Sequence, residues 1–133
     1  HDALPISHAL YSHYMDLEAV LYEALDLAGI SYERNGGLSQ PERSWPGIQN
    51  LYFPDILADR ALIKLDLQGI EVSAGSACAA GALEPSPVLS AMFGQETEEA
   101  RDRLKKSLRI SFGPETKKEE MNVLVRALAT MVK

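Results

Sequence analysis

A single cysteine is the first side chain whose type and setting could do chemistry. Cys78 stands in the run Ala-Gly-Ser-Ala-Cys-Ala-Ala-Gly, and residues 74–82 consist only of Gly, Ser, Ala and this Cys. A lone cysteine is most often a small buried hydrophobe. This run forms no apolar face of a helix or strand, so we predict that Cys78 lies on an accessible loop and acts as a nucleophile. No His or Lys is adjacent to it, so activation would come from a bound cofactor or from residues outside the chain.

An arginine on a predicted strand is the second candidate. Residues 107–113 alternate between apolar and polar side chains, which is typical of a strand with one buried face. The apolar row is Leu108, Ile110 and Phe112, and the polar row is Ser107, Arg109 and Ser111. A guanidinium held opposite the core can present two parallel donors to a carboxylate, which suits an amino-acid substrate. The alternative interpretation is a surface arginine on an edge strand.

Apolar periodicity and turn residues predict the elements that position these two side chains. The predicted order is helix 16–28 ended by Gly29, strand 30–32, loop 35–44, strand 48–53, helix 57–68, strand 70–73, the small-residue loop, helices 86–92 and 97–106, strand 107–113 and a last helix. A capping box of Thr116 and Glu119 would begin that last helix, and its apolar stripe is Leu124, Val125, Leu128, Met131 and Val132.

The predicted fold class is α+β, with a small, mostly antiparallel sheet of about four strands. Helices would cover this sheet mainly on one face. The uncovered face would then need another surface, either a missing large domain or a second subunit.

Length and composition limit the classes of function. The 133 residues have room for one domain, and a net charge of -6 without clustered Lys and Arg argues against nucleic-acid binding. No apolar run approaches the length of a membrane-spanning helix, which is about 20 residues. With one cysteine no internal disulfide is expected, which fits a reducing, cytoplasmic setting. No group of His, Cys, Asp and Glu has metal-ligand spacing, so we expect no metal site.

The first seven residues, HDALPIS, resemble the translation of a sequencing adapter. We therefore expect residues 1–7 to be non-native and leave them out of the fold prediction. The natural protein would then begin upstream, and residues 8–133 would be part of a larger protein.

Two blocks resemble the NifS/IscS-type cysteine desulfurases. The block GIEVSAGSACAAGALEPSPVL (69–89) is similar to that family's active-cysteine segment, in the branch with a longer cysteine loop. The block SLRISFGPETKKEEM (107–121) is similar to its arginine strand and the following helix. Weaker similarity at residues 45–54 and 62–69 extends the resemblance over most of the chain. The chain is therefore identified as the C-terminal small domain of such an enzyme, a fragment without the large domain.

The resemblance implies a pyridoxal-phosphate enzyme of fold-type I, related to class V aminotransferases. Such an enzyme converts L-cysteine to L-alanine and leaves a persulfide on a cysteine, here Cys78, while Arg109 holds the substrate carboxylate. The active loop would include Ala74, Gly75, Ser76 and Ala77. The implied partners are L-cysteine, a second copy in a homodimer, and a sulfur acceptor, either an iron–sulfur scaffold protein or a tRNA-thiolating enzyme.

Two positions depart from the family pattern. Pro87 stands where relatives often have His or Tyr, and the Ser-His-Lys motif that carries the cofactor lysine is missing from the chain. We therefore do not expect the chain alone to bind pyridoxal phosphate or to be active. Two alternatives stay open: a non-catalytic module that relays persulfide or docks a sulfur-transfer partner, and a selenocysteine lyase or another class V enzyme.

Overall fold

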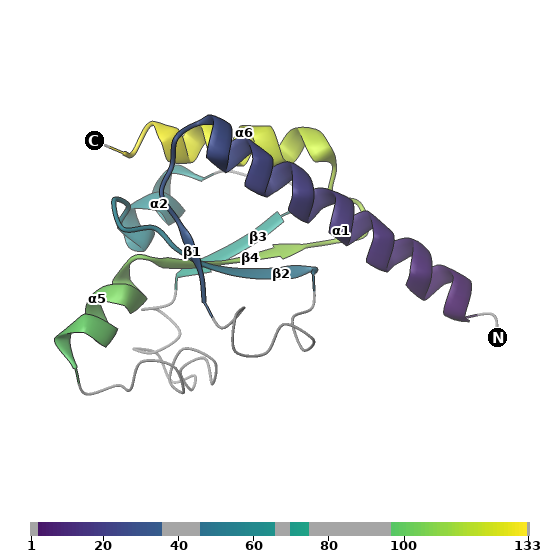
Figure 1. The fold of residues 1–133 in the computed structure, drawn as a ribbon, viewed down its shortest axis with the longest axis horizontal. Coiled ribbons are helices and arrows are strands. Elements are labelled where there is room, and N and C mark those ends of the chain that lie inside the picture. Colours follow the sequence, from purple (N-terminus) through teal and green to yellow (C-terminus); the bar gives the residue numbers. More distant parts are fainter. Residues whose placement is uncertain (1–2, 36–45, 66–69, 75–96, 133) are drawn as a thin grey trace.

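A computed structural model describes residues 3–35, 46–65, 70–74 and 97–132 of the chain (Figure 1). The described residues form four helices and one four-stranded sheet. In chain order the elements are α1 (Ala3–Leu27), β1 (Glu33–Arg34), β2 (Ile48–Tyr52), α2 (Ala58–Lys64), β3 (Ile70–Ala74), α5 (Glu98–Lys105), β4 (Ser107–Phe112) and α6 (Lys118–Ala129).

The sheet has the order β1-β2-β4-β3, and every neighbouring pair is antiparallel. In the register of β4, Arg109 faces Asn50 of β2 on one side and Ser73 of β3 on the other. Because side chains alternate along a strand, these three residues share one face of the sheet. The predicted α+β class with a small antiparallel sheet is confirmed.

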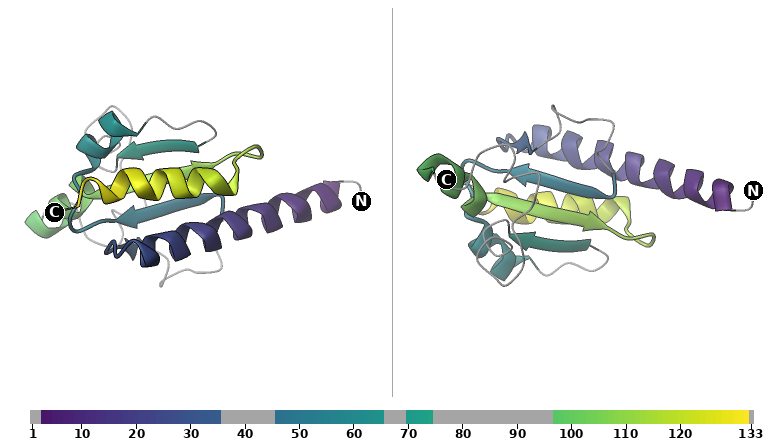
Figure 2. Two further views of the ribbon diagram at one scale, coloured as in Figure 1. Left: turned by 90° about the horizontal axis from the view of Figure 1, so that it is seen from above. Right: turned by 90° about the horizontal axis from the view of Figure 1, so that it is seen from below.

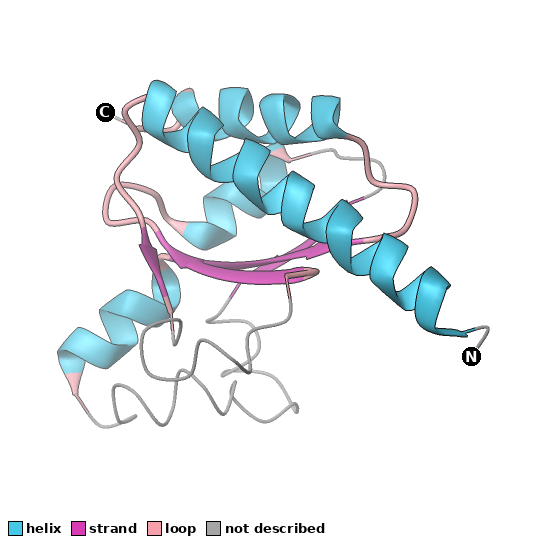
Figure 3. Cartoon of the chain, turned by 45° about the vertical axis from the view of Figure 1, so that its right-hand side comes forward, coloured by secondary structure: helices cyan, strands magenta, loops and turns pink. Residues whose placement is uncertain are grey.

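The hydrophobic core lies between α1, α6 and one face of the sheet, which we call the inner face (Figures 1 and 2). The two helices contact each other, and α2 contacts β3. The fully buried core leucines and isoleucine are Leu17, Leu21, Leu25, Leu51, Leu108, Ile110, Leu124 and Leu128. We call the opposite side of the sheet the outer face. Neither α1 nor α6 covers it (Figure 3), in agreement with the prediction of helices mainly on one face.

The first helix begins at Ala3, not at residue 16 as predicted. Its N-terminal half extends past the sheet (Figure 2), and His8, Ala9, Tyr11 and Ser12 are exposed there. Leu10 and Tyr14 still contact the core and continue the stripe of Leu17, Leu21 and Leu25, so the apolar periodicity begins earlier than the predicted start at residue 16. The predicted end is confirmed, because Gly29 adopts φ +72°. The amides of Gly29 and Ile30 bind the carbonyls of Asp26 and Leu25 (3.1 Å each), which is a Schellman motif.

The predicted strand 30–32 is wrong. Ile30 is buried behind the end of α1 as part of the Schellman motif, so the first strand is Glu33–Arg34, which pairs with Tyr52 and Leu51. Helix α2 ends at Lys64 and not at residue 68, because Leu65 has extended backbone angles. The strands at 48–53, 70–73 and 107–113 are confirmed within one residue at each end. The predicted helix 86–92 and loop residues 36–44 lie outside the described residues.

The caps of the last two helices differ in how well they follow the sequence pattern. Thr97 is the N-cap of α5, and its hydroxyl accepts from the amide of Ala100 (3.0 Å), which confirms a helix start at 97. The capping box predicted at Thr116 and Glu119 is displaced by one residue. The Glu120 carboxylate accepts from the amide of Lys117 (2.8 Å), while the Thr116 hydroxyl accepts from the amide of Gly113 (2.7 Å) and closes the preceding turn.

Within the described ranges, no helix combines the length and the apolar character that crossing a membrane would require.

Candidate functional site

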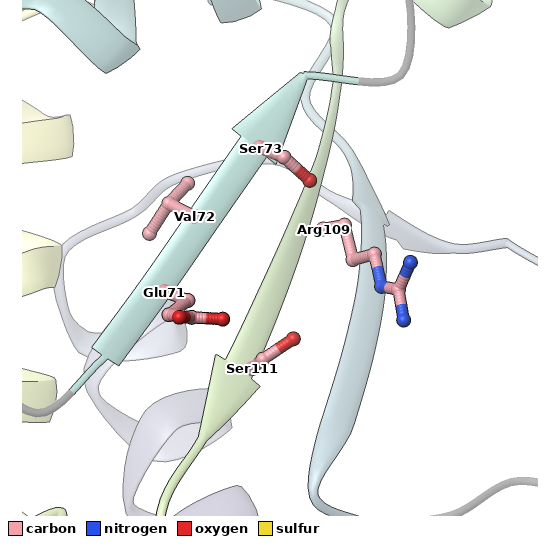
Figure 4. Close-up of a pocket in the computed structure, with 5 residues that line it drawn as sticks. All are labelled: Glu71, Val72, Ser73, Arg109 and Ser111. Atoms are coloured by element: carbon pink, nitrogen blue, oxygen red, sulfur yellow. The ribbon is translucent and has the colours of Figure 1, made fainter. Parts of the chain in front are cut away.

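Arg109 lies on the outer face of the sheet, as the alternation of strand β4 predicts. Its neighbours Leu108 and Ile110 are buried on the inner face, whereas Arg109 is exposed. The side chain leaves β4 with its guanidinium directed toward β2 (Figure 4). A central strand with partners on both sides therefore holds this cation on a face free of α1 and α6.

An open depression accompanies Arg109 on this part of the sheet. Its volume is about 470 Å³, and its lining is Glu71, Val72, Ser73, Arg109 and Ser111 (Figure 4). Ser73 is the cross-strand partner of Arg109, and Glu71 is that of Ser111. The hollow therefore combines one cation, one carboxylate and two hydroxyl groups, which can recognise a small polar ligand.

Arg109 differs from two other arginines in its charge environment. Arg34 lies 3.6 Å from a carboxylate oxygen of Glu18, and Arg103 lies 2.9 Å from one of Glu33. For Arg109, no ion pair is found among the residues that the structure describes. Its charge is thus available to an anion, and a carboxylate is the group whose geometry matches a guanidinium.

A second polar cluster lies on the inner face, between α1 and β2. Gln49 is buried there, and its side-chain amide donates to Glu18 Oε2 and to the carbonyl of Pro46 (2.8 Å each). The Tyr22 hydroxyl donates to Gln49 Oε1. Burial is the main reason why the pKa of Tyr22 is raised far above its ordinary value of 10.0. Each of these side chains has a hydrogen-bond partner within the cluster. The cluster therefore joins helix α1 to the sheet and is not a candidate ligand site.

The other predicted site residues belong to the small-residue run. Cys78, Gly75, Ser76 and Ala77 lie outside the described residues. Ala74 was expected to open the active loop, but it is the last residue of β3, fully buried and paired with Leu108. The ladder to β4 thus continues one residue further than the pattern of residues 70–73 indicated.

Sequence reasoning missed Asn50 and Ser73 as neighbours of Arg109. Alternation could have found Ser73, which shares a polar row with Glu71, but not Asn50, because its row contains Ile48 and Tyr52 and the buried row of the same strand contains the polar Gln49. Which of them would face Arg109 depends on the register of the strands, and register is set by pairing between segments far apart in the sequence.

The described lysines do not form a site for pyridoxal phosphate. The depression beside Arg109 is lined by no described lysine. The described lysines are Lys64, Lys105, Lys106, Lys117 and Lys118. Lys106 is also paired with Asp102 at 3.4 Å. The residues that line the depression therefore do not supply the lysine that the cofactor needs.

Comparisons with known proteins identify the relatives of the chain. No family model matches it. A Bacillus subtilis protein, whose name cysteine desulfurase IscS 1 is provisional, is 42% identical over 120 residues, which is 90% of this chain and 30% of that protein. The cysteine desulfurase IscS of Dictyoglomus turgidum is 38% identical over 87 residues, or 65% of this chain and 21% of that protein. A mitosomal cysteine desulfurase of Trachipleistophora hominis is 36% identical over 101 residues, or 75% of this chain and 21% of that protein.

The chain thus spans less than a third of the length of these relatives, while the relatives match most of the chain. By this similarity, which agrees with the two sequence blocks around residues 69–89 and 107–121, the chain belongs to the cysteine desulfurases of the NifS/IscS type.

Proposed function

We propose that the chain is the C-terminal small domain of a cysteine desulfurase, and that the complete enzyme moves sulfur from L-cysteine onto Cys78. The observation that carries the proposal is the guanidinium of Arg109 on the outer face of the sheet, which has no ion-pair partner among the described residues. An amino-acid substrate needs such a group for its carboxylate. The names of the relatives supply the reaction class.

Arg109 is the proposed binding group for the substrate carboxylate. The guanidinium can donate two parallel hydrogen bonds to the two carboxylate oxygens, and each such charged bond contributes about 1.5–3 kcal/mol. Asn50 and Ser73 flank it in register, so further donors are at hand. Because β4 is paired on both sides, the backbone that carries the cation is fixed before the substrate arrives.

Cys78 is the proposed sulfur acceptor. Ser73 faces Arg109 in the sheet, and Cys78 follows Ala74, the last residue of that strand, by four residues. Four residues of extended chain span at most about 14 Å, so Cys78 is connected by a short segment to the strand that faces Arg109. The reaction balances as L-cysteine plus the Cys78 thiol giving L-alanine plus the Cys78 persulfide. The substrate's carbon–sulfur bond breaks, a sulfur–sulfur bond forms, and the carbon takes up a proton.

The rest of the enzyme would lie against the outer face. Cysteine desulfurases use pyridoxal phosphate, and we propose that the region outside this chain holds it, since the described lysines do not. We also propose a homodimeric, cytoplasmic enzyme that passes its sulfur to an iron–sulfur scaffold protein or a tRNA-thiolating enzyme.

A chimeric desulfurase tests the proposal. In it, this chain replaces the segment that it matches in the Bacillus subtilis relative, and alanine and cysteine-bound persulfide are measured with L-cysteine as substrate. We expect Cys78→Ser to abolish both products while the protein stays folded. A chimeric desulfurase that is inactive, or a Cys78→Ser variant with normal turnover, would contradict the proposal. Faster turnover of selenocysteine than of cysteine would favour a selenocysteine lyase.

A further inference from the structure

Arg103 is the centre of a polar cluster on the outer face, at one end of the sheet. Its Nη1 lies 2.9 Å from Glu33 Oε1, and its Nε donates to Asn35 Oδ1 at 2.9 Å. The guanidinium carbon also lies 4.3 Å from the centre of the Tyr52 ring. One side chain of α5 therefore contacts β1, the residue that follows β1, and β2.

The cluster continues into the first residue of β4. Asn35 Nδ2 donates to the hydroxyl of Ser107 (3.1 Å), and this hydroxyl donates to the carbonyl of Arg103 (2.7 Å). Asn35 and Ser107 are both buried, at 7% and 2% exposure. Buried polar groups that are all paired hold a single geometry, because loss of one partner leaves the others unsatisfied.

The residues of this cluster adjoin the Arg109 site through the sheet. Tyr52 faces Ser107, and in the next row of the same face Asn50 faces Arg109. The backbone of Asn50 is itself part of the cluster, because its carbonyl accepts from the amide of Asn35 (2.9 Å). Strands β2 and β4 are thus both connected to Arg103 one row away from Arg109.

Glu33 gives the cluster an electrostatic role as well. It compensates the charge of Arg103, so this cation does not compete with Arg109 for an anion. Of the described residues that line the depression, Arg109 is the cation, and it has no ion-pair partner in this part of the chain, so a monocarboxylate is a ligand that matches it.

We propose that Arg103 is a positioning residue for Arg109. This proposal rests on the proposed role of Arg109 in carboxylate binding. Arg103 would hold the start of β4 and its neighbour β2 in the geometry that binds the substrate. The planar guanidinium is required for this, since Lys could replace the ion pair with Glu33 but neither the fixed Nε donor nor the stacking on Tyr52.

Steady-state kinetics of the chimeric desulfurase separate positioning from stability. For Arg103→Met we expect the KM for L-cysteine to rise about tenfold, with kcat changed less than about twofold, because the loss concerns carboxylate binding. Arg103→Lys should give an intermediate KM. Arg126→Met, which removes an exposed charge from α6, is the matched control and should leave KM unchanged.

Saturating L-cysteine provides the readout that a purely structural role would not move. It should restore the rate of Arg103→Met, whereas an enzyme that is partly unfolded loses rate at every substrate concentration. If Arg103→Met does not fold, Tyr52→Leu removes a single contact and should raise KM about threefold.

The outcomes distinguish the two proposals. An unchanged KM in folded Arg103→Met, together with a large KM increase in Arg109→Met, would overturn the positioning role alone. A fall in kcat with unchanged KM would also overturn it. No change in Arg109→Met would instead overturn the carboxylate-binding role on which it rests.

Discussion

The two faces of the sheet use the same strands in different ways. On the inner face, Leu51, Leu108 and Ile110 are fully buried under α1 and α6. On the outer face, the alternate residues of the same strands are Asn50, Ser107 and Arg109, and Arg109 is exposed. A β-strand that is buried on one side can thus carry stability on that side and binding groups on the other.

The polar side chains of the two faces also differ in how many hydrogen-bond or ion-pair partners they have. Gln49 on the inner face uses its amide fully, with Tyr22, Glu18 and Pro46 as partners. Arg109 on the outer face has no ion-pair partner among the described residues. The hydrogen bonds of Gln49 account for its burial, whereas Arg109 has no such contact among the described residues, which is why we propose a ligand for it.

The largest expected effect is a difference in the free energy of unfolding between a variant of the inner face and a variant of the outer face. Leu108→Ala removes a fully buried side chain, and we expect it to lower the free energy of unfolding by about 2–5 kcal/mol. Its neighbour provides the comparison, since Arg109→Met should change the same quantity by less than about 0.5 kcal/mol. Urea unfolding of both variants measures the difference. Equal losses would mean that the outer face also stabilises the fold through Arg109.

A smaller effect is expected for the polar cluster of the inner face. Gln49→Leu leaves the Tyr22 hydroxyl and the Pro46 carbonyl without this partner, so stability should fall by about 1–3 kcal/mol. Ser73→Ala on the outer face is the control and should stay within about 0.5 kcal/mol. Stability of Gln49→Leu at or above that of the unchanged chain would contradict the structural role of the cluster.

The smallest effect concerns pH. The pKa of Tyr22 is raised in the folded protein, chiefly by burial, so above the ordinary value near 10 the folded state keeps a proton that the unfolded state loses. The free energy of unfolding should therefore fall as pH rises through this range. Tyr22→Phe should cost about 1 kcal/mol at pH 7 and show a shallower fall between pH 9 and pH 11. An identical slope in both proteins would show that Tyr22 does not contribute.

Much of this division could be predicted from the sequence, because it rests on alternation within single strands. The rows Leu108–Ile110–Phe112 and Ser107–Arg109–Ser111 assigned each residue of β4 to its correct face. The same reasoning from local pattern failed where a residue makes a tertiary contact instead of pairing in the sheet. Ile30 looked like part of a strand, but it closes the end of α1, and the paired strand begins three residues later.

The neighbours of Arg109 could not be predicted from local sequence patterns, for a different reason. Asn50 and Ser73 are 59 and 36 residues away from it in the sequence and adjoin it only through register. Likewise, the pairing of Arg103 with Glu33 and Asn35 joins segments about 70 residues apart. Long-range contacts of this kind depend on the complete fold, so strand alternation could identify Arg109 but not its partners.

Competitive inhibition of the chimeric desulfurase tests the central claim most directly. L-alanine and ethylamine differ only in the carboxylate, so the ratio of their inhibition constants measures the contribution of the group that binds it. We expect L-alanine to bind about 100-fold more tightly in the unchanged enzyme, and the ratio to fall to nearly 1 in Arg109→Met. A ratio that is the same in both enzymes would contradict the account.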